Sequence, residues 1–223
     1  MSIIEAAVRL FAPYECLGCQ AEDDRLLCAA CAEKLPRIPS RCYRCAAATA
    51  GYAVCRECGS QTPLCQVLVY TRYQKLAKDL IHRMKYERAQ AGAAEAATLM
   101  ARLLADVPDN AVLAHIPTAT SRVRQRGYDH ALLLARALAH SGNRERAALL
   151  ARVGQAHQVG SGRMERVRQL HDAFRPMRAG AIQGRHVLLV DDVLTTGATL
   201  ETAARILKQA GAERVSAIVF AQA

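Results

Sequence analysis

Residues 187–200, which read VLLVDDVLTTGATL, restrict the possible folds of this chain more than any other segment. The first four residues are apolar and predict a strand buried on both faces, a pattern typical of parallel sheets. A helix is predicted over residues 199–210, with Gly211 ending it. A strand, a polar loop and a helix in this order place the loop at the carboxyl edge of an α/β sheet, where ligands usually bind.

The loop and the end of this strand make two different demands on a ligand. Small residues, hydroxyls and free backbone N–H groups at a helix N-terminus suit a phosphate, and here they belong to Thr195, Thr196, Gly197, Ala198 and Thr199. Asp191 and Asp192 repel phosphate, so they must serve sugar hydroxyls, a Mg²⁺ ion or a developing positive charge. A sugar phosphate that reacts through a cationic carbon satisfies both demands. The alternative is a capping pair on an ordinary helix.

Eight of the nine cysteines form four Cys-x-x-Cys pairs, whose members are Cys16, Cys19, Cys28, Cys31, Cys42, Cys45, Cys55 and Cys58. Two thiolates on one tight knuckle can bind the same metal ion, and two knuckles complete a tetrahedral zinc site. The pairs repeat after 26 and 27 residues, so we expect a duplicated zinc ribbon with two structural zinc ions. A redox motif needs only one pair, and a disulfide scaffold belongs to secreted proteins. Whether the ligands pair sequentially or interleave stays open.

The chain divides into two expected parts, an N-terminal helix with the double ribbon at 1–62 and an α/β domain at 63–223. The amphipathic start indicates a surface helix of a cytoplasmic protein and not a secretion signal, and no apolar run approaches the ~20 residues of a membrane span. Cys65 begins the strand expected at 65–70 and is predicted to be buried in the core and not to bind metal. Strands and helices alternate beyond it, which implies a parallel sheet flanked by helices. The strands are expected at 65–70, 111–117, 147–152 and 214–220, and the helices at 74–88, 91–107 and 131–140.

Two further segments are candidates for the same edge of the sheet. The loop at 117–130 follows a strand, so its backbone at Thr118 and Ala119 and the side chains of Arg122 and Arg126 are expected to bind a pyrophosphate. The alternative is a solvated basic loop. Residues 153–168 are rich in Gly and Arg and are equally suited to an active-site lid or a disordered connection.

Residues 187–199 match the thirteen-residue signature of type I phosphoribosyltransferases without a mismatch. This resemblance implies that Asp191 and Asp192 hold the ribose hydroxyls of phosphoribosyl pyrophosphate (PRPP). It also implies that the Thr/Gly loop binds the 5′-phosphate, with Mg²⁺ accompanying the pyrophosphate. The resemblance does not identify the acceptor of the ribose.

The order of four segments is similar to that of the ComF family, bacterial competence-type proteins linked to DNA uptake and use. These segments follow the paired cysteines and are LIHRMKYERA at 80–89, residues 116–138, the set Gln158, Arg166, Ala173 and Phe174, and the signature. The resemblance implies a double zinc ribbon joined to a phosphoribosyltransferase domain, with Lys85 as a secondary PRPP ligand. The chain carries Asp129 where the family usually has Asn.

The net charge of +10 favours polyanionic partners, and residues 121–178 hold twelve Arg against four acids. Arginine grips phosphate and stacks on bases, so we expect binding of single-stranded DNA through Arg124, Arg136, Arg163 and Arg166. The alternative is that this charge serves PRPP and solubility. The favoured function is therefore a PRPP-binding protein of DNA uptake that could also contact the uptake machinery. The alternative is an active phosphoribosyltransferase of nucleotide metabolism, although no base-reading hood is evident.

Overall fold

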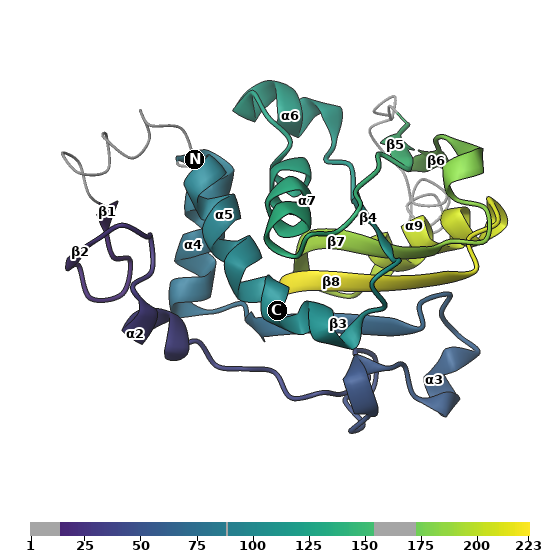
Figure 1. Cartoon of the computed structure of the whole chain (residues 1–223), viewed down its shortest axis with the longest axis horizontal. Helices are drawn as coiled ribbons and strands as arrows, with labels where there is room; N and C mark the ends of the chain where they lie inside the picture. The colour runs from purple at the N-terminus through teal and green to yellow at the C-terminus, as the bar shows by residue number, and fades with distance from the viewer. Residues whose placement is uncertain (1–13, 88, 154–172) are drawn as a thin grey trace, which may run out of the picture.

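The computed structural model describes residues 14–87, 89–153 and 173–223, and its centre is a four-stranded parallel sheet (Figure 1). The strand order is β3-β8-β7-β4, and all three neighbouring pairs run parallel. The bounds are Gln66–Arg72 for β3, Val112–His115 for β4, His186–Leu194 for β7 and Arg214–Gln222 for β8. The expected parallel sheet is confirmed.

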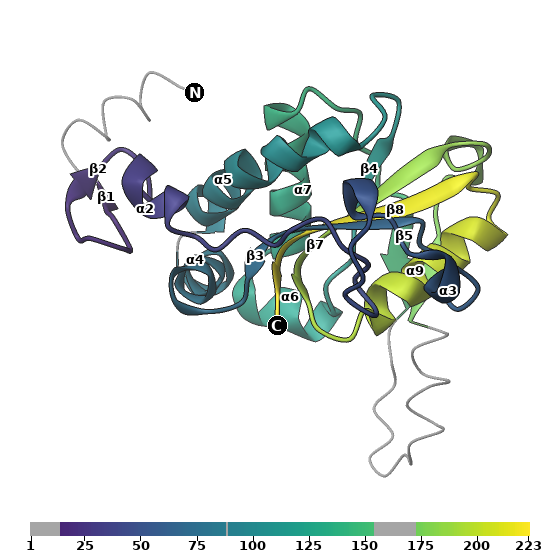
Figure 2. The ribbon, with the colours of Figure 1, turned by 90° about the horizontal axis from the view of Figure 1, so that it is seen from below.

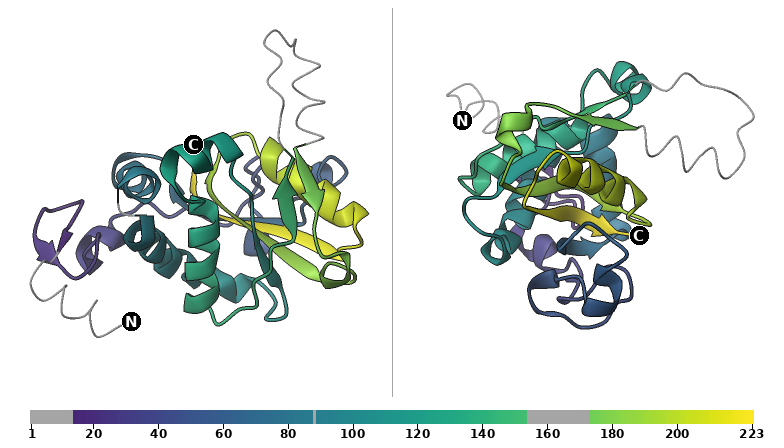
Figure 3. Two further views of the ribbon diagram at one scale, coloured as in Figure 1. Left: turned by 90° about the horizontal axis from the view of Figure 1, so that it is seen from above. Right: turned by 90° about the vertical axis from the view of Figure 1, so that its right-hand side faces the viewer.

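Helices cover both faces of this sheet, which gives three layers. On one face lie α4 (Lys75–Tyr86), α5 (Ala89–Met100) with the short helix η2 (Ala101–Asp106), and α7 (His130–Ser141). The other face carries α9 (Ala198–Gln209). Successive strand residues point to opposite faces, so Leu188 and Val190 join the first core while Val187 and Leu189 join the second. Figure 3 shows this arrangement from two further sides.

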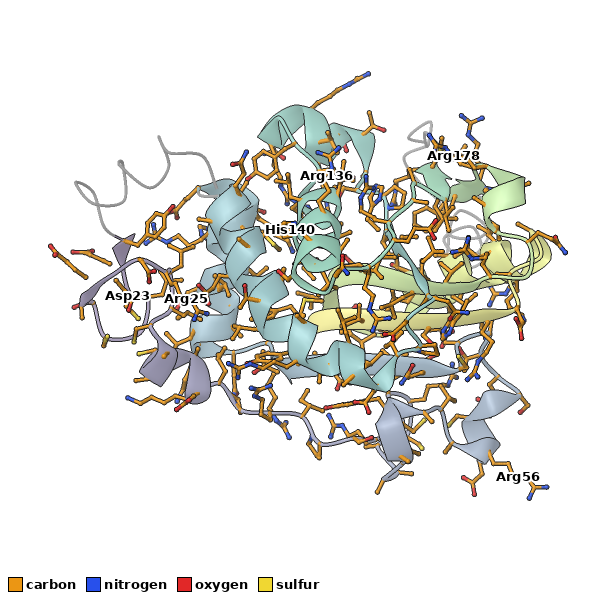
Figure 4. All side chains as sticks on the ribbon, viewed as in Figure 1. Asp23, Arg25, Arg56, Arg136, His140 and Arg178 are labelled. Atoms are coloured by element: carbon orange, nitrogen blue, oxygen red, sulfur yellow. The ribbon has the colours of Figure 1, made fainter. Side chains whose placement is uncertain are left out.

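The cysteine-rich segment forms two small units that pack at different places. The first contains β1 (Tyr14–Glu15), β2 (Glu22–Asp23) and α2 (Ala29–Glu33), and Figures 1 and 2 show it beside α4 and α5. Its Arg25, labelled in Figure 4, forms a 2.5 Å ion pair with Glu95 of α5. The second contains η1 (Ala50–Tyr52) and α3 (Arg56–Gly59) and lies along β3, where Gln66 donates to the Gly51 carbonyl over 2.5 Å.

Three elements differ from the sequence-based expectations. The expected loop at 117–130 contains a short helix, α6 (Thr120–Arg126), whose polar sequence hides it from an apolar-periodicity test. Strand β7 does not stop before the two acids but continues to Leu194, because residues 193 and 194 still pair with β8. Strand β5 (Leu150–Arg152) does not join the main sheet and pairs antiparallel with β6 (Phe174–Pro176).

Two expectations lie outside the described residues. These are the amphipathic helix at the start and the Gly- and Arg-rich segment after Val153, which includes Arg163 and Arg166. Across the stretches that the structure does describe, no helix has both the length and the apolar character needed to cross a membrane.

Candidate functional site

A polar pocket of about 810 Å³ opens at the carboxyl ends of β4 and β7. Both acids of the sequence motif line it, together with the start of α9 and the segment that leads into α6. Further lining residues come from α4, α7 and β5. The polar and charged side chains among them are Lys85, Thr118, Thr120, Ser121, Arg122, Arg124, His130, Arg152, Asp191, Asp192 and Thr199.

Asp192 is buried and held from two sides. Its Oδ2 contacts the ammonium group of Lys85, and its Oδ1 lies 3.4 Å from His130 Nε2. Burial alone would raise the pKa of Asp192, but the hydrogen bond with His130 and the charge of Lys85 hold it well below its usual range. Asp192 is therefore a fixed carboxylate whose charge is already balanced within the protein.

Asp191 has the opposite character. Burial raises its pKa well above the usual value, and the charge of Asp192 raises it further. Its Oδ1 accepts the backbone N–H of Asp192 over 2.9 Å. Asp191 forms no ion pair with any of the described residues, so its carboxyl group is available to a ligand, unlike that of Asp192.

The Thr/Gly turn between β7 and α9 is placed as the sequence predicted, but only part of it lines the pocket. Gly197 has a φ of 83° and is the N-cap residue of α9, while the Thr196 hydroxyl accepts the Ala198 amide over 3.4 Å. Of the five predicted phosphate ligands, Thr199 lines the pocket itself. Thr195 and Thr196 are exposed on the adjoining turn.

The second cysteine-rich unit reaches this turn, a contact that the sequence did not reveal. The Tyr43 hydroxyl donates to Glu201 of α9 over 2.5 Å and lies 2.8 Å from the Thr62 hydroxyl. Arg44 forms a 2.5 Å ion pair with the same Glu201 carboxylate. Burial, together with the bond to Glu201, raises the pKa of Tyr43 and keeps it protonated. A Cβ atom on Gly197 would lie only 2.9 Å from the Tyr43 ring.

The opposite wall of the pocket is shaped by Asp129. Its carboxylate accepts the amide and hydroxyl of Thr118 over 3.0 and 2.8 Å, and it caps α7 by accepting the amides of Ala131 and Leu132. Thr118 thus lines the pocket with both of its donors engaged by Asp129. Ala119 and Arg122 line the same pocket. Asp129 therefore has a structural role, and its negative charge is stabilised by these four hydrogen-bond donors.

The predicted arginines separate into different places. Arg122 and Arg124 line the pocket, but Arg126 turns away and donates to the Tyr86 hydroxyl over 3.0 Å. Its predicted contact with a pyrophosphate in this pocket is therefore not supported by the geometry. Arg136 is exposed on α7 (Figure 4).

Sequence reasoning missed Arg152 and His130. Arg152 lines the pocket from β5, and its guanidinium lies 5.3 Å from the ring centre of Phe174. Burial lowers its pKa and the charge of Arg122 lowers it further, whereas Asp191 opposes both. A half-buried cation facing a carboxyl group and an open pocket suits a ligand phosphate. The only signal in the sequence was an arginine at the end of a strand.

The structure groups the cysteines sequentially. Each group brings four sulfur atoms within 4.8 Å of one another, Cys16, Cys19, Cys28 and Cys31 in one and Cys42, Cys45, Cys55 and Cys58 in the other. Although burial opposes it, backbone N–H donors lower the pKa of Cys16 and Cys42 to about 6. Four converging sulfurs fit a closed, structural zinc shell. Cys65 lies outside both groups and is half-buried, with its sulfur 3.1 Å from the Ser216 hydroxyl.

Comparison with family models gives two matches. Residues 7–67 match the family described as a double zinc ribbon domain, and residues 143–223 match the phosphoribosyl transferase domain. These matches agree with the two cysteine groups and with the signature strand and helix.

Curated relatives extend over most of the chain. The DNA utilization protein YhgH of Salmonella typhimurium is 30% identical over 207 residues, covering 85% of this chain and 87% of the relative. The YhgH protein of Escherichia coli K12 has 30% identity with the same coverage. Competence protein ComFC of Bacillus subtilis is 29% identical over 201 residues, covering 84% of this chain and 80% of the relative.

Solved structures give more distant matches. An allosteric regulatory enzyme of purine biosynthesis has 16% identity and a TM-score of 0.43, covering 61% of this chain but only 29% of its own. A glutamine PRPP amidotransferase from Bacillus subtilis has 17% identity and a TM-score of 0.43, covering 61% of this chain and 30% of its own.

Proposed function

The chain belongs to the ComF family, and from this premise we propose that it binds PRPP or a related sugar phosphate while serving DNA uptake in natural competence. The competence and DNA-utilization names of its relatives supply the biological setting. The observation that carries the ligand proposal is the pair of adjacent carboxyl groups with opposite environments at one end of the pocket.

Each part of a phosphoribosyl compound has a matching part in the pocket. Asp191 accepts hydrogen bonds from the ribose hydroxyls, while Lys85 and His130 keep Asp192 ionised and oriented beside it. The turn from Thr195 to Thr199 faces the 5′-phosphate through amides and hydroxyls at a helix N-terminus. The pyrophosphate lies against the cationic side chains of Arg122, Arg124 and Arg152.

The acidic end of the pocket fits Mg²⁺ shared with the ligand. Asp191, Asp192 and His130 each present one donor atom within 4.8 Å of the others. Magnesium prefers oxygen ligands and is commonly held by one or two carboxylates plus substrate phosphates. Bound there, the ion would neutralise charge on a leaving pyrophosphate. Because Lys85 already neutralises Asp192, Asp191 is the carboxylate available to it.

An active transferase is the second candidate, and the state of Asp191 favours it. Burial and the charge of Asp192 raise its pKa, and a carboxyl group perturbed in this way is suited to proton transfer in a reaction. Arg122 and Arg152 would stabilise the pyrophosphate as the bond to the sugar carbon breaks.

We also propose that the chain binds single-stranded DNA. Exposed arginines at positions 124 and 136 supply charge on α6 and α7. The affinity should fall steeply with salt, because arginine contacts release counterions from the phosphates.

Isothermal titration of PRPP with Mg²⁺ tests the ligand proposal. The double variant Asp191→Asn with Asp192→Asn should lose PRPP while keeping its zinc and its circular dichroism spectrum. Asp109→Asn is the matched control, because the Asp109 side chain is 99% exposed away from the pocket. Normal binding by the double variant would place the ligand elsewhere. Pyrophosphate release with DNA, with nucleobases or with no acceptor decides between binding and transfer.

A further inference from the structure

A second cavity of about 370 Å³ adjoins the candidate PRPP pocket. It lies between α4 and α6, and Lys85 and Arg122 line both cavities. Its volume falls in the range of about 300–1,000 Å³ that is usual for small-molecule sites. None of the groups described above as the ribose or 5′-phosphate ligands faces it, so it is a separate place for a second ligand.

The lining of this cavity favours an anion. Four cationic side chains, Lys78, Lys85, Arg122 and Arg126, line it, against a single carboxylate from Asp79. Lys85 is already paired with Asp192. The other three cations still outnumber the single carboxylate, so the cavity has an excess of positive charge. The Nε of Arg126 is buried and has no hydrogen-bond partner among the described residues, which is a costly arrangement for a charged donor.

The same cavity offers an aromatic surface. Tyr86 is 56% exposed although it is a large ring on the last turn of α4. The Arg126 guanidinium lies 4.8 Å from the centre of this ring and donates to its hydroxyl, while the His82 ring lies 4.9 Å away. These contacts hold the exposed ring in one orientation before any ligand arrives, as a stacking surface requires.

We propose that this cavity binds one nucleotide of a single-stranded DNA, with the base stacked at Tyr86 and the adjoining phosphates at Arg126 and Lys78. A free nucleobase is neutral and would gain little from four cations, whereas a strand carries a phosphate on each side of the base. Aromatic stacking combined with cationic groups is the usual recognition of single strands without a fixed sequence. The shared lining at Lys85 and Arg122 would set this nucleotide next to the phosphoribosyl ligand, a placement that rests on the proposed function.

Fluorescence anisotropy with a labelled fifteen-nucleotide oligothymidine tests this site. Tyr86→Leu should weaken binding roughly 5- to 150-fold, the range expected for losing one stacked base. Tyr86→Phe retains the ring and should stay within about 3-fold of wild type. Tyr86→Leu should leave the salt dependence unchanged, because no phosphate contact is lost, whereas Arg126→Gln should reduce its slope by about one.

Arg56→Gln is the matched control for Arg126→Gln, since Arg56 is exposed on α3 and points away from the domain (Figure 4). Wild-type affinity in both Tyr86→Leu and Arg126→Gln would overturn the site, as would a wild-type protein that binds no strand at low salt. Tighter binding of a free nucleobase, in competition with the strand, would also overturn it and make the cavity an acceptor site. Titration of PRPP keeps the two proposals apart. If wild type binds no PRPP but Tyr86→Leu still weakens DNA binding, the proposed PRPP binding fails and this inference stands.

Discussion

Two glycines with the same backbone conformation test how tightly the second cysteine-rich unit packs on the Thr/Gly turn between β7 and α9. Gly127 and Gly197 have φ values of 82° and 83°, in the left-handed region. Among the described residues, a Cβ added to Gly127 would meet no atom within 4 Å, whereas one added to Gly197 would lie 2.9 Å from the Tyr43 ring. Alanine at either position costs about 1–2 kcal/mol for the left-handed backbone. Only Gly197→Ala adds a steric penalty.

The size of that penalty depends on whether the ring can move. The Tyr43 hydroxyl is bonded to Glu201 and Thr62, so the ring cannot swing aside without losing these bonds. Overpacking of this kind costs about 1–3 kcal/mol. We therefore expect Gly127→Ala to lower the free energy of unfolding by about 1–2 kcal/mol and Gly197→Ala by about 2–5 kcal/mol.

Urea unfolding of zinc-loaded protein, followed by far-ultraviolet circular dichroism, measures both values. The excess of Gly197→Ala over Gly127→Ala should disappear in a Tyr43→Leu background, as a double-mutant cycle would show. Equal losses of unfolding free energy in the two glycine variants would refute the reasoning, because the close packing of the Tyr43 ring on Gly197 would then add no steric penalty. An excess that persists without the tyrosine ring would refute it too, since the strain would come from the turn itself.

Three further predictions follow from the site and the cysteine groups. Elemental analysis of protein purified without chelator should give about two zinc ions per chain, and a single zinc ion would contradict the two cysteine groups. Removing the metal should unfold the cysteine-rich units, because they have little core of their own. Since the folded-state pKa of Asp191 is raised, its charge destabilises the fold as the pH rises through that pKa. Asp191→Asn should therefore raise the free energy of unfolding at pH 8, with a gain that shrinks on acidification, and a constant gain would speak against this cause. Thr196→Asp places a negative charge on the Thr/Gly turn and should weaken PRPP binding by several kcal/mol in calorimetry. Unchanged affinity would show that the 5′-phosphate binds elsewhere.

The sequence predicted those features that depend on local pattern. Apolar runs at 111–117, 187–190 and 214–220 became parallel strands, and the spacing of the cysteines anticipated two groups of four. The family models match the cysteine-rich segment and the segment that contains the signature, and the relatives align with most of the chain.

Features that depend on contacts between distant residues were not predictable in this way. Tyr43 meets Glu201 across 158 positions, and nothing in either neighbourhood signals the other. An arginine in this loop is expected to bind phosphate. The Arg126 side chain instead turns away from the pocket and donates a hydrogen bond to the hydroxyl of Tyr86, 40 positions earlier in the chain. Polar α6 lacked the apolar periodicity that reveals a helix.

The position of β8 in the sheet affects the order in which the chain can fold. Strand β3 is the first of the sheet to be synthesised, yet its partner within the sheet is β8, and the pair Leu68 and Ile218 is separated by 150 positions. Closing so large a loop is slow and entropically costly, so β3 must wait while the intervening chain is made. Isolated bridges from Arg37 to Thr71 and from Ala53 to Gln66 attach the cysteine-rich segment to β3. A metal-stabilised unit can fold early, and it would then cover the outer edge of β3, the edge opposite to β8, which would otherwise invite aggregation.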